Sequence, residues 1–589
     1  MTTRSARVRA PELVGRGGWL NTGGRELRLA DVRGSFVLLD FWTFCCVNCL
    51  HVLDELRPLE ERLADVLIVV GVHSPKFEHE REHDAVVAAV ERYEVHHPVL
   101  DDPDLETWSQ YAVRAWPTLV LVDPEGYVVH VASGEGHVEG IGLLLDELVT
   151  QHEAKGTLRR GDSPFVPPPA RPGELAFPGK ALRLPDGRLL VSDSAHHSLV
   201  VLDGDEVVRR IGTGARGRAD GVAPTFAEPQ GVCMLDDGRV LVADTANHLL
   251  RVLDLPTGEV ITVAGTGEVW RPGDQTSGPA LEIRLSTPWD VAVWGGEVVI
   301  AMAGTHQLWA WDGSRVRVIA GTTGEGLRDG EAMAAYLAQP SGLAPGDGRL
   351  WFVDAETSSL RWYADGQIGT AVGTGLFDFG HRDGLAADAA FQHPLGVTAL
   401  PDGSVAISDT YNGAVRRYDP STDLVSTLAT DLAEPSDAVV DGELLLVVES
   451  AGHRVTRIRL PSTAQEIHGE LQRTARPITV LAPGVVQLAV VFTPPPGQKL
   501  DDSFGPSTRV TVSASPTSLL TSGAGESADL ARSLVLLAGE GVLHIAASAA
   551  TCDAEAEHPA CRIAQQDWGI PIRVEPGGSE ELSLMLSGA

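Results

Sequence analysis

Three patterns of apolar and polar positions follow one another along the chain. In the first 152 residues, short apolar runs alternate with stretches whose apolar residues recur at helical spacing. The apolar runs lie at 34–42, 66–72, 119–123 and 127–133, and the helical stretches at 50–63, 79–93 and 137–152. Strands that alternate with helices predict an α/β domain built on a largely central sheet.

From about residue 173 to 460 the chain repeats itself. Each unit holds a strand, a two-residue turn, a second strand that ends in an acidic residue in all units but one, a polar corner and a third strand. Such units cannot bury their faces alone and must stack radially, so six of them predict a six-bladed β-propeller. An all-β solenoid is the alternative, although solenoid repeats usually run shorter. The six aligned corner positions are Asp193, Asp244, Ala303, Asp354, Asp409 and Glu449, spaced 40 to 59 residues apart.

The last repeat ends at about Leu460 with three evident strands. We expect its fourth strand to come from residues 465–468 or from Glu174–Phe177, because a closed ring hides the unpaired edge that an open sheet would expose.

Residues 464–589 hold apolar strands separated by Pro, Gly and Ser, a spacing typical of a small antiparallel β-sandwich. The chain is thus expected to be multidomain, α/β followed by all-β. The predicted parts are an α/β domain at 1–152, a Pro-rich linker at 153–172, the propeller at 173–463 and the sandwich at 464–589.

The net charge of the chain indicates which kinds of partner it does not bind. The chain has 46 Lys plus Arg against 80 Asp plus Glu, a formal net charge of −34. A polyanion repels phosphate backbones, so we expect neither nucleic acid nor a membrane as a partner. No segment reaches the roughly 18 uninterrupted apolar residues of a membrane span. The arginine-containing N-terminus lacks a following apolar core, which favours a cytoplasmic protein.

The sharpest motif for chemistry is Cys46-Val-Asn-Cys49, which follows a strand and opens a helix. Two thiols at this spacing can form a disulfide with little rearrangement, and a helix N-terminus stabilises a thiolate on the first. Cys46 would attack a disulfide and Cys49 would resolve the mixed disulfide. A second Cys-x-x-Cys is missing and His51 alone would complete a zinc site poorly, so we expect no metal and no cofactor.

The segment from Asp40 to Cys49 resembles the active site of the thioredoxin fold, where a Trp-containing strand end precedes Cys-x-x-Cys. Asp40 matches the buried acid that takes the proton of the resolving cysteine in that family, and Trp116-Pro117-Thr118 looks like its cis-proline loop. Cys45 stands where the family usually has a second Trp.

The resemblance implies catalytic roles for Cys46, Cys49, Asp40 and Pro117. It also implies substrate contacts at Trp42, Trp116 and Thr118. We expect Cys46 to be partly exposed in the first turn of a helix that begins near Cys49, a buried Asp40, a cis Trp116–Pro117 bond, and Cys45 turned away from the pair. An inert scaffold of the same fold is the alternative. A peroxidase is disfavoured because Leu39 stands where its proline would be.

The other cysteines and the corner histidines have simpler interpretations. Cys552 and Cys561 flank an acidic loop and are predicted either to form a second redox pair or to be a static bridge or unrelated thiols. Their region loosely looks like the immunoglobulin-like domain of DsbD-type proteins. Cys233 is predicted to be a core residue. The corner histidines are predicted to be turn and rim residues rather than metal ligands: His196, His197, His248, His306 and His453.

The repeats resemble NHL repeats through a second signature between blades, GTG followed by Asp-Gly, with aspartates at 220, 329 and 383 that can bond turn amides. The whole chain looks like the NHL-repeat-containing thioredoxin-like family. That resemblance implies a cytosolic thiol–disulfide oxidoreductase with protein thiol or disulfide substrates and an unidentified thiol reductant, whose propeller face recruits a protein partner. A non-enzymatic scaffold is the second hypothesis, and a propeller enzyme with a channel site is the third.

Overall fold

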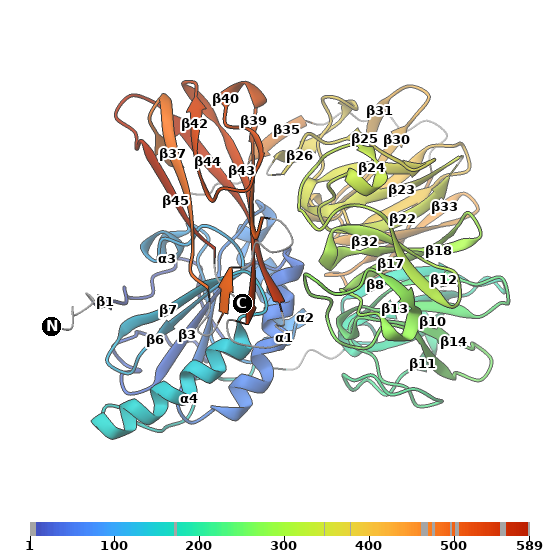
Figure 1. Ribbon diagram of the computed structural model, residues 1–589. Helices are drawn as coiled ribbons and strands as arrows, with labels where there is room; N and C mark the ends of the chain where they lie inside the picture. The colour runs from blue at the N-terminus through green and yellow to red at the C-terminus, as the bar shows by residue number, and fades with distance from the viewer. Residues whose placement is uncertain are drawn as a thin grey trace. The chain divides into compact units, whose positions relative to one another are not determined.

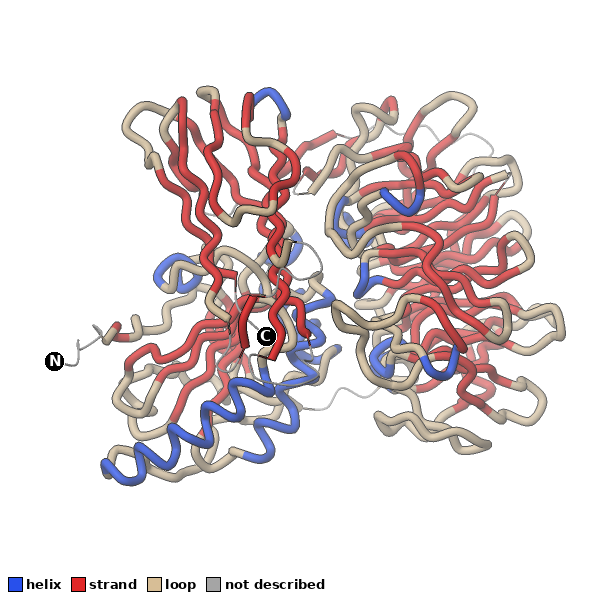
Figure 2. Tube along the Cα trace, in the orientation of Figure 1, coloured by secondary structure: helices blue, strands red, loops and turns tan. Residues whose placement is uncertain are grey.

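The computed structural model describes residues 7–169, 173–346, 348–376, 378–460, 469–473, 478–494, 498–500, 506–553 and 561–586. The chain separates into two compact units, one of Met1–Ala170 with Ala475–Ala589 and one of Arg171–Thr474 (Figure 1). The helices of more than one turn all belong to the first unit, and the other helices of the described chain are three-residue 3-10 turns (Figure 2). The four-part division given above is finer and stays a prediction.

The N-terminal domain is the α/β fold that its alternating pattern predicts. Within residues 7–169 a single sheet has the strand order β1-β7-β6-β3-β4-β5-β2, with β3 parallel to β4 and antiparallel to β6. The strands are β1 (Val8–Arg9), β2 (Gly18–Leu20), β3 (Phe36–Trp42), β4 (Leu67–His73), β5 (Val99–Asp101), β6 (Thr118–Val122) and β7 (Tyr127–Ser133). The helices are α1 (Val47–Arg62), η1 (His79–Arg81), α2 (His83–Arg92), α3 (Glu106–Gln110) and α4 (Val138–Lys155). The helix expected to begin near Cys49 therefore begins at Val47.

Strand β3 is buried on both faces, and its alternation decides which side chains meet which helix. Phe36 and Leu38 pack with α1 and α4, whereas Leu39 and Phe41 pack in a second core that includes Trp108 of α3. Asp40 has the parity of Leu38. The strand pattern thus places an acidic residue on the face covered by α1, the helix that carries Cys49.

The propeller has six blades, as the repeats predict. In the described part of Arg171–Thr474, the inner strands β8, β12, β17, β22, β28 and β32 contact one another in a closed ring. Each of the first five blades has at least four strands, and the sixth has three. The bounds of the first three blades are β8 (Pro178–Arg183), β9 (Leu189–Asp193), β10 (Ser198–Asp203), β11 (Glu206–Ile211); β12 (Pro229–Met234), β13 (Val240–Asp244), β14 (Leu249–Leu253), β15 (Val260–Ala264); β16 (Ser277–Pro279), β17 (Pro288–Trp294), β18 (Glu297–Met302), β19 (Gln307–Trp311) and β20 (Arg315–Ala320).

The remaining strands complete the ring. They are β21 (Gly330–Glu331), β22 (Pro340–Gly346), β23 (Arg349–Asp354), β24 (Ser359–Ala364), β25 (Gln367–Val372); β27 (Gly384–Leu385), β28 (Gly396–Ala399), β29 (Val405–Asp409), β30 (Ala414–Asp419), β31 (Leu424–Ala429); β32 (Pro435–Asp441), β33 (Leu444–Glu449) and β34 (Arg454–Arg459). A separate pair, β26 (Asp378–Arg382) with β35 (Gly469–Arg473), lies outside the blades.

Ring closure differs from the prediction. Residues 174–177 form no strand, so that candidate for the fourth strand of the last blade is wrong, and residues 465–468 lie outside the described residues. The first and last blades are joined instead by a shared apolar core and by single hydrogen bonds. The amide of Phe177 donates to Nδ1 of His453 at 3.0 Å, Oγ of Ser436 donates to the carbonyl of Gly179 at 2.7 Å, and the amide of Ala181 donates to Asp437 at 2.9 Å.

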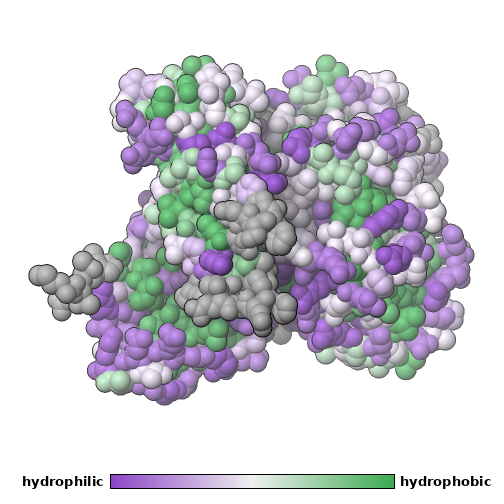
Figure 3. Space-filling view, viewed as in Figure 1, coloured by the Kyte–Doolittle hydropathy of each residue, from purple (hydrophilic) through white to green (hydrophobic). Residues whose placement is uncertain are grey.

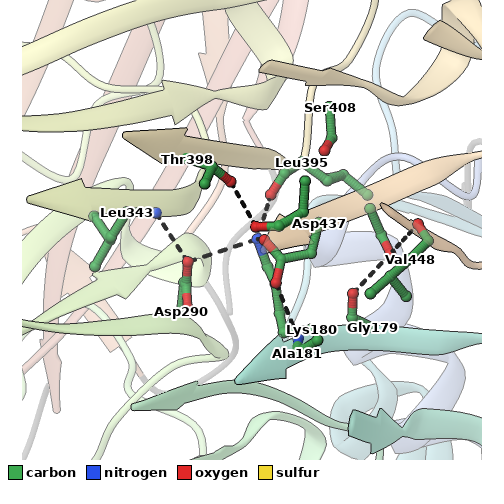
Figure 4. A network of polar contacts seen from close by, with 12 residues as sticks. Gly179, Lys180, Ala181, Asp290, Leu343, Leu395, Thr398, Ser408, Asp437 and Val448 are labelled. Atoms are coloured by element: carbon green, nitrogen blue, oxygen red, sulfur yellow. Dashed lines mark hydrogen bonds and ion pairs between the residues drawn. The ribbon is translucent and has the colours of Figure 1, made fainter. Parts of the chain in front are cut away.

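A buried lysine links blades where the inner strands meet (Figure 4). Nζ of Lys180 donates to the carbonyl of Leu395 at 2.6 Å and lies 3.6 Å from Asp290 and 3.9 Å from Asp437. Each carboxylate also accepts a backbone amide, from Leu343 and from Ala181 respectively. The lysine on β8 therefore connects the first, third, fifth and sixth blades, and the polar groups of this network bond one another.

Each acidic corner residue is buried and bonds an arginine. The pairs are Asp193–Arg210, Asp244–Arg251, Asp354–Arg361, Asp409–Arg416 and Glu449–Arg454. The aspartates at 220, 329 and 383, expected to bond turn amides, bond three of these same arginines and strand threonines. In the third blade the equivalent position is Met302 rather than the predicted Ala303, because β18 ends at Met302, whose sulfur lies 3.3 Å from the amide of Ser286.

Four corner histidines bond the next blade. His197, His248, His306 and His453 adopt positive φ, and Nδ1 of each accepts an amide of the following blade, those of Glu228, Thr287, Gln339 and Phe177. His196 instead bonds Asp193 of its own corner at 2.8 Å. The predicted position in turns is thus correct, and the bonds between blades are a role that the sequence alone did not indicate.

The C-terminal domain is a β-sandwich whose core contains side chains of both sheets. One sheet has the order β36-β44-β43-β39-β41, with β38 also on β43, and the other has the order β40-β42-β37-β45. The strands are β36 (Thr479–Leu481), β37 (Gly484–Phe492), β38 (Gln498–Leu500), β39 (Thr508–Ser515), β40 (Leu520–Ser522), β41 (Gly525–Ser527), β42 (Ala531–Leu536), β43 (Gly539–Asp553), β44 (Cys561–Val574) and β45 (Glu581–Leu586). The sandwich was predicted to be antiparallel, but it is not wholly so, because β36–β44 and β37–β45 are parallel pairs.

Hydrophilic side chains are spread over the visible surface, as expected for a net charge of −34 (Figure 3). None of the helices found in the described residues combines the length and apolar character that a membrane span requires.

Candidate redox site

The two thiols of the motif occupy different environments. Cys46 is the N-cap residue of α1 and is partly exposed, whereas Cys49 is fully buried, and both are free thiols. The amide of Cys49 donates to the carbonyl of Cys46 at 3.0 Å, so the turn closes directly on the first cysteine. Burial, and next the neighbouring Cys46, raise the pKa of Cys49 well above its usual value. An accessible thiol at a helix N-terminus, where negative charge is favoured, therefore precedes a protected one.

Asp40 lies on β3, two residues before this strand ends at Trp42. Its side chain is fully buried, and neither carboxylate oxygen has a hydrogen-bond partner among the described residues. Burial, and next the charge of Glu60, raise the pKa of Asp40 to about 8. The charge of Asp40 in turn contributes to the raised pKa of Cys49, so the two groups sense each other. A carboxyl group with this pKa can exchange a proton near neutral pH.

The loop before β6 has the expected cis bond between Trp116 and Pro117. Its shape is fixed by Thr118, whose hydroxyl donates to the carbonyl of Ala115 at 2.8 Å and lies 2.9 Å from Oγ of Ser133. Trp116 packs against Trp108 with ring centroids 4.5 Å apart. Thr118 and Trp42 are both buried, so contact of their side chains with a substrate stays a prediction.

The C-terminal domain contacts this same loop. Ala115 packs in the core of the sandwich, and Nη1 of Arg114 donates to Oγ1 of Thr479 at 3.1 Å. Arg114 and Ala115 are the two residues before Trp116 of the cis bond, so the sandwich helps to hold the segment that carries Pro117.

Glu80 of η1 holds the turn that leads to Cys46, and sequence reasoning missed it. Its buried carboxylate accepts hydrogen bonds from Oγ1 of Thr43 at 2.6 Å and from the amides of Cys45, Lys76 and Phe77 at 2.8 to 3.0 Å. Four donors fill the acceptor capacity of a carboxylate. Cys45 is buried beside this cluster, with Sγ 4.0 Å from Oγ1 of Thr43. Its orientation relative to Cys46 and Cys49 stays a prediction.

His51 and the cysteines outside the motif have the following contacts. Nδ1 of His51 lies 2.5 Å from Oε2 of Glu135. Cys552 is disulfide-bonded, and the ladder of β43 and β44 places residue 561 opposite it, while residues 554–560 lie outside the described residues. Cys233 is buried in β12, and burial raises its pKa to about 12, in keeping with a core thiol.

One group in the described residues has metal-ligating side chains close together: Asp123, Glu125 and His152. Nη2 of Arg7 already bonds Asp123 at 2.5 Å and Glu125 at 3.1 Å, and Nδ1 of His152 lies 2.8 Å from Oγ1 of Thr157. A guanidinium between two carboxylates takes the place that a cation would need, so this group is an ion-pair network.

Comparison with known proteins defines the class first. A family model described as thioredoxin-like matches residues 34–128, and the NHL repeat model matches residues 226–253. The protein is a thioredoxin-like domain joined to an NHL-repeat propeller and a β-sandwich.

Relatives that match most of this chain then define the family. The chain is 34% identical over 498 residues to NHL repeat-containing protein 2 of Homo sapiens, with 74% of this chain and 68% of that protein covered. It belongs to the family of NHL repeat-containing protein 2. It is also 36% identical over 490 residues to the protein SUPPRESSOR OF QUENCHING 1, chloroplastic, of Arabidopsis thaliana, with 77% of this chain and 46% of that protein covered. The chain thus spans about half to two thirds of these relatives.

A shorter relative has a named activity. Over 128 residues the chain is 30% identical to the thiol-disulfide oxidoreductase ResA of Geobacillus thermodenitrificans, with 21% of this chain and 70% of that protein covered.

Proposed function

We propose that the protein is a thiol–disulfide oxidoreductase that uses Cys46 and Cys49. The observation that carries the proposal is the pairing of a partly exposed Cys46 at the N-terminus of α1 with a buried Cys49 and a buried, unbonded Asp40. An inert scaffold needs neither the difference in exposure nor a buried carboxyl group without donors. The name of ResA and the cis bond before Pro117 support the same activity.

The reaction follows from these positions. The Cys46 thiolate attacks one sulfur of a substrate disulfide, forming a mixed disulfide and releasing a substrate thiolate. Asp40 as carboxylate takes the proton of Cys49, and the Cys49 thiolate attacks Sγ of Cys46 and releases the second substrate thiolate. The substrate gains two electrons and becomes a dithiol, while Cys46 and Cys49 become a disulfide. An external thiol reductant restores the dithiol, and the same steps in reverse oxidise a substrate.

The other domains have supporting roles in this proposal. The polar groups of Lys180, Asp290 and Asp437 bond one another where the inner strands meet, which favours a partner protein on the propeller face over a ligand in the channel. Cys552 with Cys561 is a second redox pair that would exchange with Cys46 and Cys49. We place this activity in the cytoplasm, although the name of the Arabidopsis thaliana relative is chloroplastic.

The test is a trapping experiment with full-length protein. Cys49→Ser should accumulate mixed disulfides on Cys46, Cys46→Ser should abolish reduction of a small disulfide such as 5,5′-dithiobis(2-nitrobenzoate) under limiting reductant, and the double variant is the control. Substrate proteins identified by mass spectrometry would support the oxidoreductase. If the wild-type protein exchanges with neither small disulfides nor protein disulfides, the scaffold function replaces it.

A further inference from the structure

A set of buried polar atoms lies beneath the thiols and is not used by the reaction as proposed. Both oxygens of Asp40, Nε1 of Trp42 and Nε2 of His97 are buried, and none of them has a hydrogen-bond partner among the described residues. Buried polar groups are nearly always satisfied by protein or by water. Three such side chains close together therefore require a shared explanation.

The indole and imidazole nitrogens both lie close to Gly71. The ladder of β3 and β4 pairs Asp40 with Gly71, and a Cβ atom at position 71 would lie 2.9 Å from Nε1 of Trp42 and 3.1 Å from Nε2 of His97. Any larger side chain would fill the space between the indole and the imidazole. The glycine keeps room over the sheet between the indole and the imidazole, at the strand position that pairs with Asp40.

The far side of the imidazole is fixed by Glu60. Nδ1 of His97 lies 3.0 Å from Oε1 of Glu60, on α1. A carboxylate partner holds the proton on Nδ1, which leaves Nε2 with its lone pair toward Gly71. The side chain of His97 is 4% exposed and that of Glu60 is 21% exposed. The pair therefore extends from the buried space to the solvent.

We propose that His97 and Glu60 form a proton exit for Asp40, connected to it by water held over Gly71. This inference rests on the proposed function. One water molecule can accept from Nε1 of Trp42 and donate to Nε2 of His97 and to one oxygen of the Asp40 carboxylate, which gives the water three bonds and each of the three side chains a partner. His97 and Glu60 act through Asp40 and are positioning and relay residues.

The relay completes the proton balance of the resolving step. The thiol proton of Cys49 passes to Asp40, then through water to Nε2 of His97, while the Nδ1 proton passes to Glu60 and on to solvent. Without an exit, a fully buried carboxyl group would retain its proton and could not accept the next one. The net change is one proton released to solvent for each Cys49 thiolate used.

The surrounding charges are few. Cys49 and Glu60 face Asp40 from α1, and Gly71 of β4 offers no side chain. Arg57 of α1 bonds the carbonyls of Tyr93 and Glu94. Burial lowers the pKa of His96, which is next to His97 in the sequence. His73 packs edge-on against the indole of Trp42, and burial lowers the pKa of His73 to about 3, so it stays neutral through the working range.

The experiment measures the two chemical steps separately in full-length protein. Gly71→Ala, His97→Phe and Glu60→Gln remove the water space, the acceptor and the outer carboxylate. The matched controls are Gly140→Ala in α4, where a Cβ meets nothing within 4 Å, and the exposed Glu61→Gln next to Glu60. We expect resolution of the mixed disulfide to slow about tenfold or more in the three variants, with unchanged alkylation of Cys46. The controls should match the wild type.

An infrared titration provides the second readout and needs no substrate. The band of the protonated Asp40 carboxyl group is assigned by its loss in Asp40→Asn. Glu60→Gln should move its midpoint below the wild-type value of about 8, and Glu61→Gln should not. Resolution within twofold of wild type in all three variants, or an Asp40 band unmoved by Glu60→Gln and His97→Phe, overturns the relay. Loss of all exchange in the wild type with the Asp40 shift intact overturns the proposed function instead.

Discussion

The propeller and the thioredoxin-like domain both bury carboxyl groups, and Asp409 of the propeller and Asp40 of the thioredoxin-like domain differ in their hydrogen bonds. Asp409 at a propeller corner accepts from Arg416 at 2.8 Å, from Asn412 at 2.8 Å and from the amide of Gln392 at 2.7 Å. Asp40 in the thioredoxin-like domain has no such donor among the described residues. Burial raises the pKa of Asp409 to about 6 and that of Asp40 to about 8. A bonded carboxylate therefore serves the fold, and an unbonded one is available for chemistry.

The largest expected effect comes from breaking a bonded corner. Arg416→Met should lower the free energy of unfolding by about 3–5 kcal/mol, because it leaves Asp409 and Asp383 buried without their cation. Urea unfolding of the full chain measures this. Arg417→Met on the same strand is the control, since Arg417 pairs with the exposed Asp402 and should cost at most about 1 kcal/mol. Equal costs for the two variants would contradict the distinction.

Asp40→Asn is expected to raise the free energy of unfolding at high pH rather than lower it. The folded pKa of about 8 lies above the unfolded value of about 3.9, so the unfolded state ionises first and the wild type loses stability as pH rises between these values. Asp40→Asn removes this loss. It should match the wild type at pH 4 and exceed it by a few kcal/mol at pH 8.

The same substitution should slow resolution by about 100-fold or more, because Cys49 loses its base. Urea unfolding and mixed-disulfide decay, each followed across pH, test the two effects. A variant that is destabilised at pH 8, or that resolves at the wild-type rate, would show that Asp40 is structural.

Glu80 is a hydrogen-bonded, buried carboxylate inside the thioredoxin-like domain. It tests whether such carboxylates stabilise the fold in this domain as they do in the propeller. Glu80 has four donors, so Glu80→Gln should reduce the free energy of unfolding by about 1–3 kcal/mol, because an amide group cannot accept all of them. The control is Glu82→Gln, whose side chain is 72% exposed. Thermal unfolding of both variants is compared with alkylation of Cys46, which should slow only for Glu80→Gln, as the turn before α1 loosens. A stable variant would assign Glu80 no part in holding that turn.

Residues close in sequence could be predicted, and residues brought together by packing could not. Cys46, Cys49 and Asp40 lie within ten positions, and the cis-proline loop has its own local pattern. Gly71, Glu80 and His97 come from other elements, and their spacing carries no signal until β4 and η1 pack beside β3. In the third blade the predicted corner position, Ala303, was wrong by one residue. This blade lacks the acidic residue that marks the strand end, and the strand ends at Met302. Ring closure depends on pairing across the whole propeller, which local alternation does not encode.

The smallest effect is expected for Cys45→Ser, and it separates the side chain of Cys45 from its backbone. The amide of Cys45 donates to Glu80, and this bond persists in the variant. The thiol is 4.0 Å from Oγ1 of Thr43, and a serine hydroxyl of similar size can bond the same atom. We expect turnover within about twofold of wild type and a cost of about 1 kcal/mol in unfolding free energy, since a buried hydroxyl is more polar than a thiol. Disulfide reduction and urea unfolding are measured together, with Cys233→Ser in the propeller as the control for a buried thiol far along the sequence from the motif. A loss of turnover comparable to that of Cys46→Ser would make Cys45 a third redox thiol. The contrast between bonded and unbonded carboxyl groups would then no longer separate fold from chemistry, because Cys45, which is buried beside the fully bonded Glu80, would take part in the reaction.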